Sequence, residues 1–487
     1  MAWSWGDSFD LYTAATDLAT GYWDALAGAP SFVAGRFGGQ AFSMNSSSVG
    51  VNKSSGQNDA VHHIVVAFKS TAAISGTSNG CLLQLLDGTS PQCTIVFRSD
   101  GAILLQTGTL GGTTVATYTG AVTAANVWYA FEFEITVHNS AGTFAVRKNG
   151  STSNDFSATS LNTRGGTANA YANKLAVGMG TILSTHVVDD LFWQSSAATG
   201  TWLGDIRCYT RYPASDSSVQ FSRPSPVAIT SAIASTLSDV ANDARFIAFT
   251  ATFTGTIGTA ILYANAGATA NVKTTIYDNT AANVAGLPLG SANVLVNPVA
   301  GANTVTWASP VAVTAGTTYW LATDVDATVV WVTGNSANGS KATITYASFP
   351  TNNPTINASN ASLRYIINIT PSFNYQFVNE TTQDTTTSYV YDSTAGHADF
   401  YGLATATSTP STVVAVTTRG YMSKSDAGTR SAAVQMKSGA TTVASTTLGL
   451  GSDFGWFWRT DTVDPNTSAT WTASAVNSIT VGPTVIA

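Results

Sequence analysis

Residues 127–150 read VWYAFEFEITVHNSAGTFAVRKNG, and this stretch decides the fold class. Apolar and polar side chains alternate over 131–137, a period of two that is typical of a β-strand with one buried face. A second alternating run, Thr143–Lys148, follows and ends at Asn149 and Gly150. Both of these residues tolerate positive φ, so the dipeptide predicts a hairpin turn. The stretch therefore predicts neighbouring strands and no helix.

The composition favours strands over helices throughout the chain. Charged residues make up 10% of the sequence, whereas roughly 25% is usual in soluble domains. Glu132, Glu134 and Glu380 are the only glutamates, so the residues that usually cover exposed helix faces are nearly missing. Runs rich in Val, Thr, Ile and aromatic residues recur instead, bounded by turn formers. Examples are 62–70, 93–99, 102–108, 244–255, 363–371, 431–439 and 454–461. The sequence predicts an all-β protein made of sandwiches or jelly rolls.

The length of 487 residues exceeds one ordinary hydrophobic core, so several domains are expected. A boundary is indicated at about 213–229, where Pro213, Pro224 and Pro226 lack backbone donors and stand among turn-forming serines. Strand-like runs resume on its far side. We predict three domains, at 1–213, 227–371 and 374–487.

The charge balance excludes several partners. The formal net charge is −7 and the pI is about 5.1, and no cluster of Lys or Arg is available to neutralise phosphates. We therefore expect no nucleic-acid binding. No apolar run approaches the roughly 20 residues that span a bilayer, and the opening MAWSWGDSFD lacks the segments of a secretory signal. We expect synthesis in a cytoplasm without an export signal, and no insertion into a membrane.

Two adjacent carboxylates, Asp189 and Asp190, stand inside the apolar run VVDDLFWQ at 187–194. In a regular strand neighbours point to opposite faces, so Asp189 would share a face with Leu191 and Trp193. The two carboxylates then diverge and cannot act as a close catalytic pair. One of them could join a calcium site, but calcium needs six or more oxygens from several segments. We expect strand-end aspartates that bond to loop backbone.

Glu132 and Glu134 are two residues apart and share one face of their strand, roughly 7 Å apart. A pair of carboxylates is what glycoside cleavage requires. Some jelly-roll glucanases carry Glu-x-Asp-x-x-Glu on such a strand, but here Glu134 replaces the Asp and Val137 replaces the second Glu. We expect a solvated polar face opposite Phe131, and no catalytic residue.

The histidines and cysteines show no metal-ligand spacing. His62 and His63 would point apart in a strand, and the other histidines are scattered. The three cysteines are expected as buried thiols, with one Cys81–Cys93 bridge as the alternative. We therefore expect no metal and no cofactor. The residues concerned are His62, His63, His138, His186, His397, Cys81, Cys93 and Cys208.

The twelve tryptophans are mostly expected in cores, as for Trp320 in GTTYWLATD. Exposed aromatic rings could instead stack on sugar faces, which lets a protein with few charges bind glycans. Candidates by their places near termini and strand edges are Trp3, Trp5, Trp202, Trp456 and Trp458. Each is expected to pack against the protein, so no ligand-binding residue is assigned.

Several phrases occur in an order that resembles a known family, the concanavalin A-like (laminin-G-type) jelly roll of tailed-bacteriophage virion proteins. The phrases are WGDSFDLYTAATDLATGYWDAL (5–26), GRFGGQAFS (35–43), VWYAFEFEITVHNSAGTFAVRKNG (127–150), VVDDLFWQ (187–194) and WLGDIRCYTRYPASD (202–216). The last part of the chain resembles the domain that follows this jelly roll in the same proteins. Its phrases are NYQFVNETTQDTTTSYVYDSTAGHADFYGL (374–403), SKSDAGTRSAAVQMKSG (423–439) and DPNTSATWTASAVNSITVG (464–482).

The chain departs from the family between these two parts, which usually follow each other closely. The segment 227–371 stands between FSRPSP (221–226) and TPSFNY (370–375) as an insertion. With TTIYDNTAANVAGLP (274–288) and VTAGTTYWLATD (313–324), it is similar to a β-sandwich module of extracellular and adhesive proteins. Whole domains are tolerated as insertions where termini lie close together at a surface.

The resemblance implies a concanavalin A-like jelly roll, two further β-sandwich domains and no catalytic residues. It implies a virion structural protein, tail-associated, that binds other virion proteins, forms a homo-oligomer and touches host-surface polysaccharide. A head decoration or head-fibre protein is the alternative within the same particle. A glycan-degrading enzyme and a free carbohydrate-binding module are alternatives from other classes.

Overall fold

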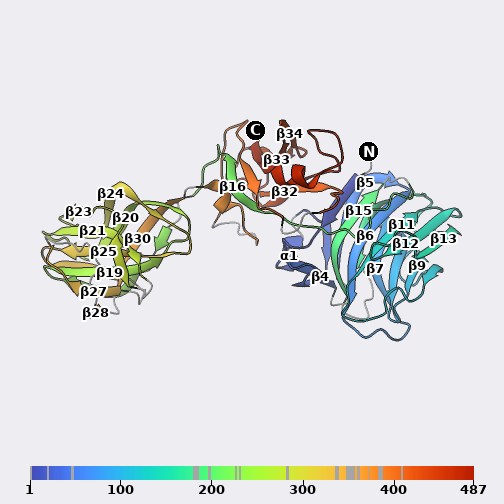
Figure 1. Ribbon diagram of the computed structural model, residues 1–487, viewed down its shortest axis with the longest axis horizontal. Helices are drawn as coiled ribbons and strands as arrows, with labels where there is room; N and C mark the ends of the chain where they lie inside the picture. Colours follow the sequence, from blue (N-terminus) through green and yellow to red (C-terminus); the bar gives the residue numbers. More distant parts are fainter. Residues whose placement is uncertain are drawn as a thin grey trace. The chain divides into compact units, whose positions relative to one another are not determined.

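In the computed structural model the described residues form two compact units (Figure 1). The first unit comprises 1–221, 378–387 and 392–487, and the second comprises 222–377 and 388–391. The predicted ranges 1–213 and 374–487 thus share one unit, and their division into separate domains stays a prediction. The described residues are 3–18, 21–44, 49–178, 186–195, 199–224, 227–229, 232–280, 284–334, 339–346, 357–358, 362–371, 373–381, 388–406 and 410–487.

Two antiparallel sheets build the N-terminal part of the first unit (Figure 1). Across the first sheet the order is β13 (Phe156–Leu161), β12 (Gly142–Lys148), β11 (Tyr129–Thr136), β6 (Val61–Ser70), β15 (His186–Ser195), β4 (Gln40–Met44) and β3 (Ser31–Ala34), with β1 (Trp3–Asp7) paired to β15. Across the second it is β10 (Thr114–Tyr118), β9 (Ile103–Thr107), β8 (Ser90–Arg98), β7 (Asn79–Asp87), β14 (Ala172–Gly178), β5 (Gly50–Asp59) and β2 (Ala25–Ala27). The short helix α1 (Ala15–Leu18) lies between β1 and β2 in the chain.

The core of this sandwich follows from the alternation in β11. Phe131, Phe133 and Ile135 are fully buried in one cluster with apolar residues of both sheets, and the rings of Phe131 and Phe133 stack at 5.9 Å. Asn149 and Gly150 after β12 have φ of 52° and 74°, the positive values that their sequence predicts. The all-β prediction is confirmed, because nearly all of the helices and strands in the described residues are strands.

The C-terminal part of the first unit is a smaller sheet and a two-stranded ribbon. The sheet order is β16 (Pro213–Ser218), β31 (Phe400–Leu403), β37 (Thr480–Val485), β33 (Ser431–Ser438) and β34 (Thr441–Ala444), with β35 (Leu448–Gly449) paired to β33. The ribbon is β32 (Val416–Met422) with β36 (Gly455–Asp461), and α2 (Ala473–Ser478) precedes β37. The start of the expected boundary segment is therefore a strand, because Pro213 opens β16 at a sheet edge, where no donor is needed.

The second unit has two seven-stranded sheets in its described residues. One has the order β17 (Val227–Ile229), β30 (Tyr365–Pro371), β20 (Gly255–Ala264), β26 (Val329–Gly334) and β18 (Ala232–Asp239), with β24 (Gly301–Val313) on β20 and β29 (Ser362–Leu363) on β26. The other has β22 (Ala285–Pro288), β21 (Asn271–Asn279), β25 (Thr318–Val325), β19 (Asp243–Thr250), β27 (Gly339–Thr343) and β28 (Asn357–Ala358), with β23 (Asn293–Val296) on β21. A 3₁₀ turn, η2 (Asn374–Phe377), follows β30 at the end of the first segment of this unit. Both sheets contribute to one core, and Leu262 and Leu321 are fully buried in it.

Among the described helices, none has the length and apolar character needed to cross a membrane.

Candidate functional site

The Asp189–Asp190 pair lies at a β-bulge in the middle of β15. Along β6 the partners of Asp189 and Phe192 are Ala67 and Val65, so three steps on one strand match two on the other. Asp190 takes up the extra residue with φ of 48°. The bulge reverses the alternation, and Val188 joins Leu191 and Trp193 in the core. The prediction that Asp189 shares their face is therefore wrong.

Both aspartates are buried and bond to loop backbone, as the sequence predicted, but they lie inside the strand and not at its end, because the bulge accommodates them there. Asp189 Oδ2 accepts the Arg36 N–H at 2.7 Å, and Asp190 Oδ1 accepts the Cys208 N–H at 2.8 Å. Burial raises the pKa of Asp189 to about 6 and, together with the charge of Asp189, raises that of Asp190 to about 7. The pair therefore fixes two loops, and its contribution to the free energy of unfolding depends on pH.

Stability should fall with rising pH in part because of Asp190. Between pH 3.8 and about pH 7 the native state still holds a proton on Asp190 that the unfolded chain has released. The free energy of unfolding therefore falls as the pH rises through this interval. Asp190→Asn keeps the acceptor for Cys208 and should make this loss shallower by an amount on the order of 1–3 kcal/mol. Urea unfolding of both proteins across this interval tests it. The buried His62 and His186, whose pKa values burial lowers to about 4, titrate with the opposite sign and cancel in the difference. Parallel curves for the two proteins would contradict the prediction.

A network joins the phrases that carry the family resemblance. Asp7 accepts hydrogen bonds from the Tyr12 hydroxyl at 2.7 Å and from the Trp23 indole at 2.9 Å. Asp10 accepts the Gln40 N–H at 3.1 Å, which connects the first phrase to the loop of the second. Asp189, which belongs to the fourth phrase, binds the same loop. Carboxylates of the first and fourth phrases therefore both hold the loop of the second phrase.

The fifth phrase joins the network through an ion pair. Arg36 donates to Asp205 with both terminal nitrogens at 2.6 Å, a bidentate fork. The Arg36 guanidinium also lies 3.9 Å from Asp190. Residues 169 apart in sequence are thus held in one geometry.

Glu132 and Glu134 lie on the face of β11 opposite the core, but the prediction of a solvated face is wrong. Their side chains are buried because the loop at 199–204 covers them. Glu132 accepts the N–H groups of Leu203 and Gly204 at 2.6 and 2.8 Å. Glu134 accepts the N–H of Gly200 and lies 3.2 Å from His63 Nε2. These two carboxylates therefore hold the backbone of the loop in place through hydrogen bonds.

Replacing Glu132 by glutamine should loosen that loop. One of the two amides would then face an NH₂ group, and losing a hydrogen bond to a charged group costs about 1.5–3 kcal/mol. Exchange of the Leu203 and Gly204 amides, followed by NMR, should accelerate about tenfold or more. Amides of β7 serve as the control and should be unchanged. Unchanged protection at both loop amides would contradict the prediction.

The histidines lie apart, as predicted. His62 faces the core and accepts the Trp193 indole N–H at 3.2 Å, and His186 packs edge-on to Phe97 at 4.8 Å. His138 Nδ1 accepts the Ala141 N–H at 2.8 Å, and His397 pairs with Asp392 at 2.9 Å. No group of three or more His, Cys, Asp and Glu side chains in the described ranges could hold a metal ion.

The cysteines are free thiols in the structure, so the alternative Cys81–Cys93 bridge is not present. Cys81 and Cys93 are buried, as predicted, whereas Cys208 is only partly so. Burial raises the pKa of all three thiols, which disfavours the reactive thiolate.

The tryptophans singled out from sequence pack against protein side chains. Trp5 is fully buried, and Trp3 contacts Trp193 edge-on at 4.8 Å. Trp202 lies under the Arg147 guanidinium at 4.2 Å. Trp456 is buried, Trp458 lies beneath Lys53 at 5.0 Å, and Trp320 is buried as predicted.

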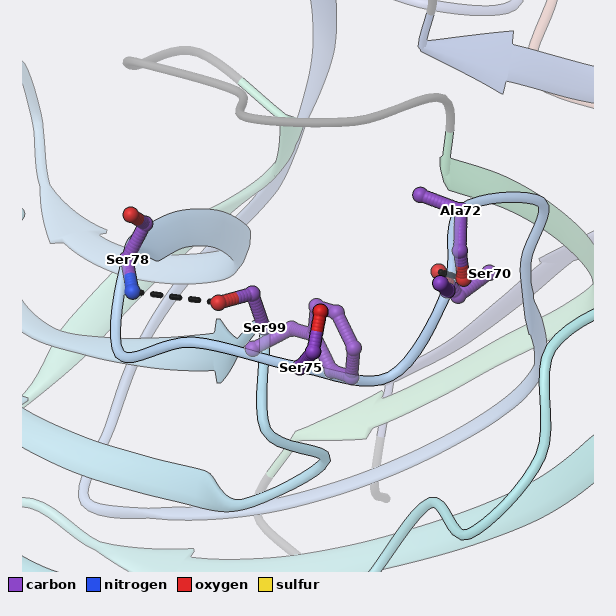
Figure 2. Close-up of a pocket in the computed structure, with 7 residues that line it drawn as sticks. Ser70, Ala72, Ser75, Ser78 and Ser99 are labelled. Carbon is purple, nitrogen blue, oxygen red and sulfur yellow. Dashed lines mark hydrogen bonds between the residues drawn. The ribbon is translucent and has the colours of Figure 1, made fainter.

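A shallow pocket of about 250 Å³ opens at one end of the first sandwich (Figure 2). Serine hydroxyls dominate its lining, and two of them are engaged, since Ser70 donates to the Ala72 carbonyl and Ser99 accepts the Ser78 N–H. The Phe97 ring is buried and offers no open face. The residues drawn in Figure 2 carry no ionisable side chain, so the pocket supplies no acid or base.

The sequence analysis missed one exposed cluster, which we call the Phe37 platform: Arg36, Phe37, Arg207 and Tyr209. Phe37 is 50% exposed, and Tyr209 is 38% exposed. The guanidinium carbons of Arg36 and Arg207 each lie 4.7 Å from the Phe37 ring centroid. Arg207 also lies 5.0 Å from the Tyr209 centroid. Arg36 and Phe37 belong to the second phrase and Arg207 and Tyr209 to the fifth, but only folding brings them together.

No family model matches the chain, and no curated protein matches it. Solved structures with a similar arrangement include alginate lyase vAL-1 from Chlorella virus, 10% identical over 38% of this chain and 98% of its own, with a TM-score of 0.28. Domain 4 of AbnA, a GH43 extracellular arabinanase from Geobacillus stearothermophilus, in complex with arabinotriose, is 19% identical over 35% and 78%, with a TM-score of 0.26. The Ca²⁺/Man2-bound exoplasmic/lumenal domain of VIP36 is 12% identical over 35% and 81%, with a TM-score of 0.25. At such scores these likenesses carry no argument about function.

Proposed function

We propose that this chain is a bacteriophage virion structural protein, associated with the tail, that displays β-sandwiches toward host-surface polysaccharide. One observation carries the proposal: the phrases that resemble the phage jelly roll meet in a single network. Asp10, Asp189 and Asp205 come from three phrases, and each binds the loop that holds Arg36 or Gln40. A requirement for this network would account for the occurrence of these phrases together.

The use of the carboxylates supports a display role over catalysis. A catalytic pair must reach a substrate bond with at least one proton to move. Glu132 and Asp190 instead accept loop N–H groups in buried positions. A rigid scaffold presented in several copies would gain avidity from weak individual contacts.

Mass spectrometry of purified particles of the phage that encodes the chain tests this proposal. The chain should be present in particles, and antibodies against it should label tails in electron micrographs. Absence from purified particles would overturn the proposal. Labelling of heads alone would show that the chain is a head decoration or head-fibre protein instead of a tail protein.

The enzymatic alternative has its own test. If the chain degraded a host polysaccharide and Glu132→Gln abolished that activity, the chain would be an enzyme and the proposed display role would be wrong. We expect no release of reducing ends by either protein.

A further inference from the structure

We propose that the Phe37 platform binds an acidic glycan, with a sugar ring stacked on Phe37 and its carboxylate held by Arg207. This inference rests on the proposed contact with host polysaccharide, for which it names a site and a ligand class. It concerns the first unit alone.

The aromatic part of the platform is half exposed beside its two guanidinium groups. Phe37 stands at the tip of its loop with half of its surface exposed, next to Gly38 and Gly39, which are also exposed. A Cβ at Gly38 would meet nothing within 4 Å, so no other part of the chain packs over the loop at that residue. Tyr209 adds a second, partly exposed ring with a polar end. Apolar rings beside polar groups are the surface on which sugar faces stack.

The loop that carries Phe37 is fixed before any ligand arrives. Asp189 holds its backbone at Arg36, and Asp10 holds it at Gln40. Gly39 has a φ of 68°, and a Cβ there would lie 1.8 Å from Asp10 Oδ1, so a side chain at this position is excluded. A ring that is already held in place loses little conformational freedom on binding.

The two arginines differ in what they offer. Arg36 is neutralised by its fork to Asp205. Arg207 forms no ion pair within 4 Å of any described residue, and its hydrogen bond to the Phe37 carbonyl is long at 3.4 Å. Its planar guanidinium matches a carboxylate with two parallel hydrogen bonds, a geometry that a neutral hydroxyl does not satisfy. The protein has a net charge of −7, so an acidic ligand requires a local cation of this kind.

The probes are oligogalacturonate, oligomannuronate and sialyllactose, each with its carboxyl-reduced counterpart. Titration of the full chain by NMR or calorimetry at millimolar sugar should show binding of an acidic probe, about tenfold tighter than its reduced form. Phe37→Ala and Arg207→Ala should each weaken binding about tenfold. Arg207→Lys should recover only part of the affinity, since it restores charge without the fork.

Matched controls come from the same sandwich. Arg164→Ala removes a half-buried cation, and Val127→Ala removes an exposed apolar side chain; both should leave binding unchanged. Unaltered melting temperatures would show that the four alanine variants fold. The proposal is overturned if no acidic probe binds, if reduced sugars bind equally, or if Phe37→Ala and Arg207→Ala bind normally. If the chain is found in virions but binds no acidic probe, the platform is refuted and the proposed virion role stands. If it binds an acidic probe but is absent from virions, the virion role is refuted and the platform stands.

Discussion

Replacing Arg419 by methionine should lower the free energy of unfolding of the first unit by about 3–5 kcal/mol, because it leaves a buried carboxylate without its cation. Arg419 on β32 donates to Asp7 Oδ1 at 3.0 Å and to the Tyr12 hydroxyl at 3.3 Å. Its guanidinium carbon lies 3.7 Å from the Tyr22 ring centroid. The side chain therefore pairs with a carboxylate 412 residues away, and it adds a hydrogen bond to Tyr12 and a cation–π contact with Tyr22.

Hydrogen exchange followed by mass spectrometry at increasing urea concentration reports each unit separately. The whole chain need not unfold in two states, so a single midpoint would mix the units. Peptides of β1 and β32 should lose protection at lower urea in Arg419→Met, while peptides of the second unit keep theirs. Arg430→Met is the matched control, because its pair with Asp426 is solvent-exposed and contributes little to stability. Equal shifts in the two variants would refute the role of Arg419.

The corresponding substitution in the second unit, Arg245→Met, should also cost about 3–5 kcal/mol. Arg245 Nε lies 2.8 Å from both oxygens of Asp239, and its Nη2 lies 2.7 Å from Oδ1. Both side chains are almost completely buried. Burial raises the pKa of Asp239 even though Arg245 hydrogen-bonds to it, so without Arg245 the carboxylate would be strongly disfavoured.

The double variant Asp239→Leu/Arg245→Met separates the pair from the packing around it. Removing both charges leaves no unpaired ion, so stability should return to within about 1–2 kcal/mol of the original. Peptides of β18 and β19 report this in the same exchange experiment. A double variant that is as unstable as Arg245→Met alone would show that the arginine acts through its packing instead of its charge.

The first sandwich could be anticipated residue by residue where the strand is regular. In β11 the alternation assigns Phe131 and Phe133 to the core, and both are there. The same rule fails in β15, because one residue, Asp190, adopts positive φ and shifts every following side chain to the other face. A bulge depends on the partner strand, and the local pattern does not record it.

Burial of the polar face of β11 could not be predicted from the local sequence either. Glu132 and Glu134 have the pattern of an exposed face, yet the loop at 199–204 covers them. A hydrogen bond between residues about 70 positions apart follows from the route of the chain, and no periodicity encodes that route.

The sequence by itself determined the all-β class, the buried faces of regular strands, the separation of the histidines and the loop-binding use of the paired aspartates. These follow from the two-residue period of a strand and from side-chain chemistry, which are local properties. Only the tertiary structure decided the bulge, the covered glutamates, the Arg419 pair and the Phe37 platform. Phe37 and Arg207 are 170 residues apart, and contacts at that separation exist only after the sheets have paired and fixed their loops in space.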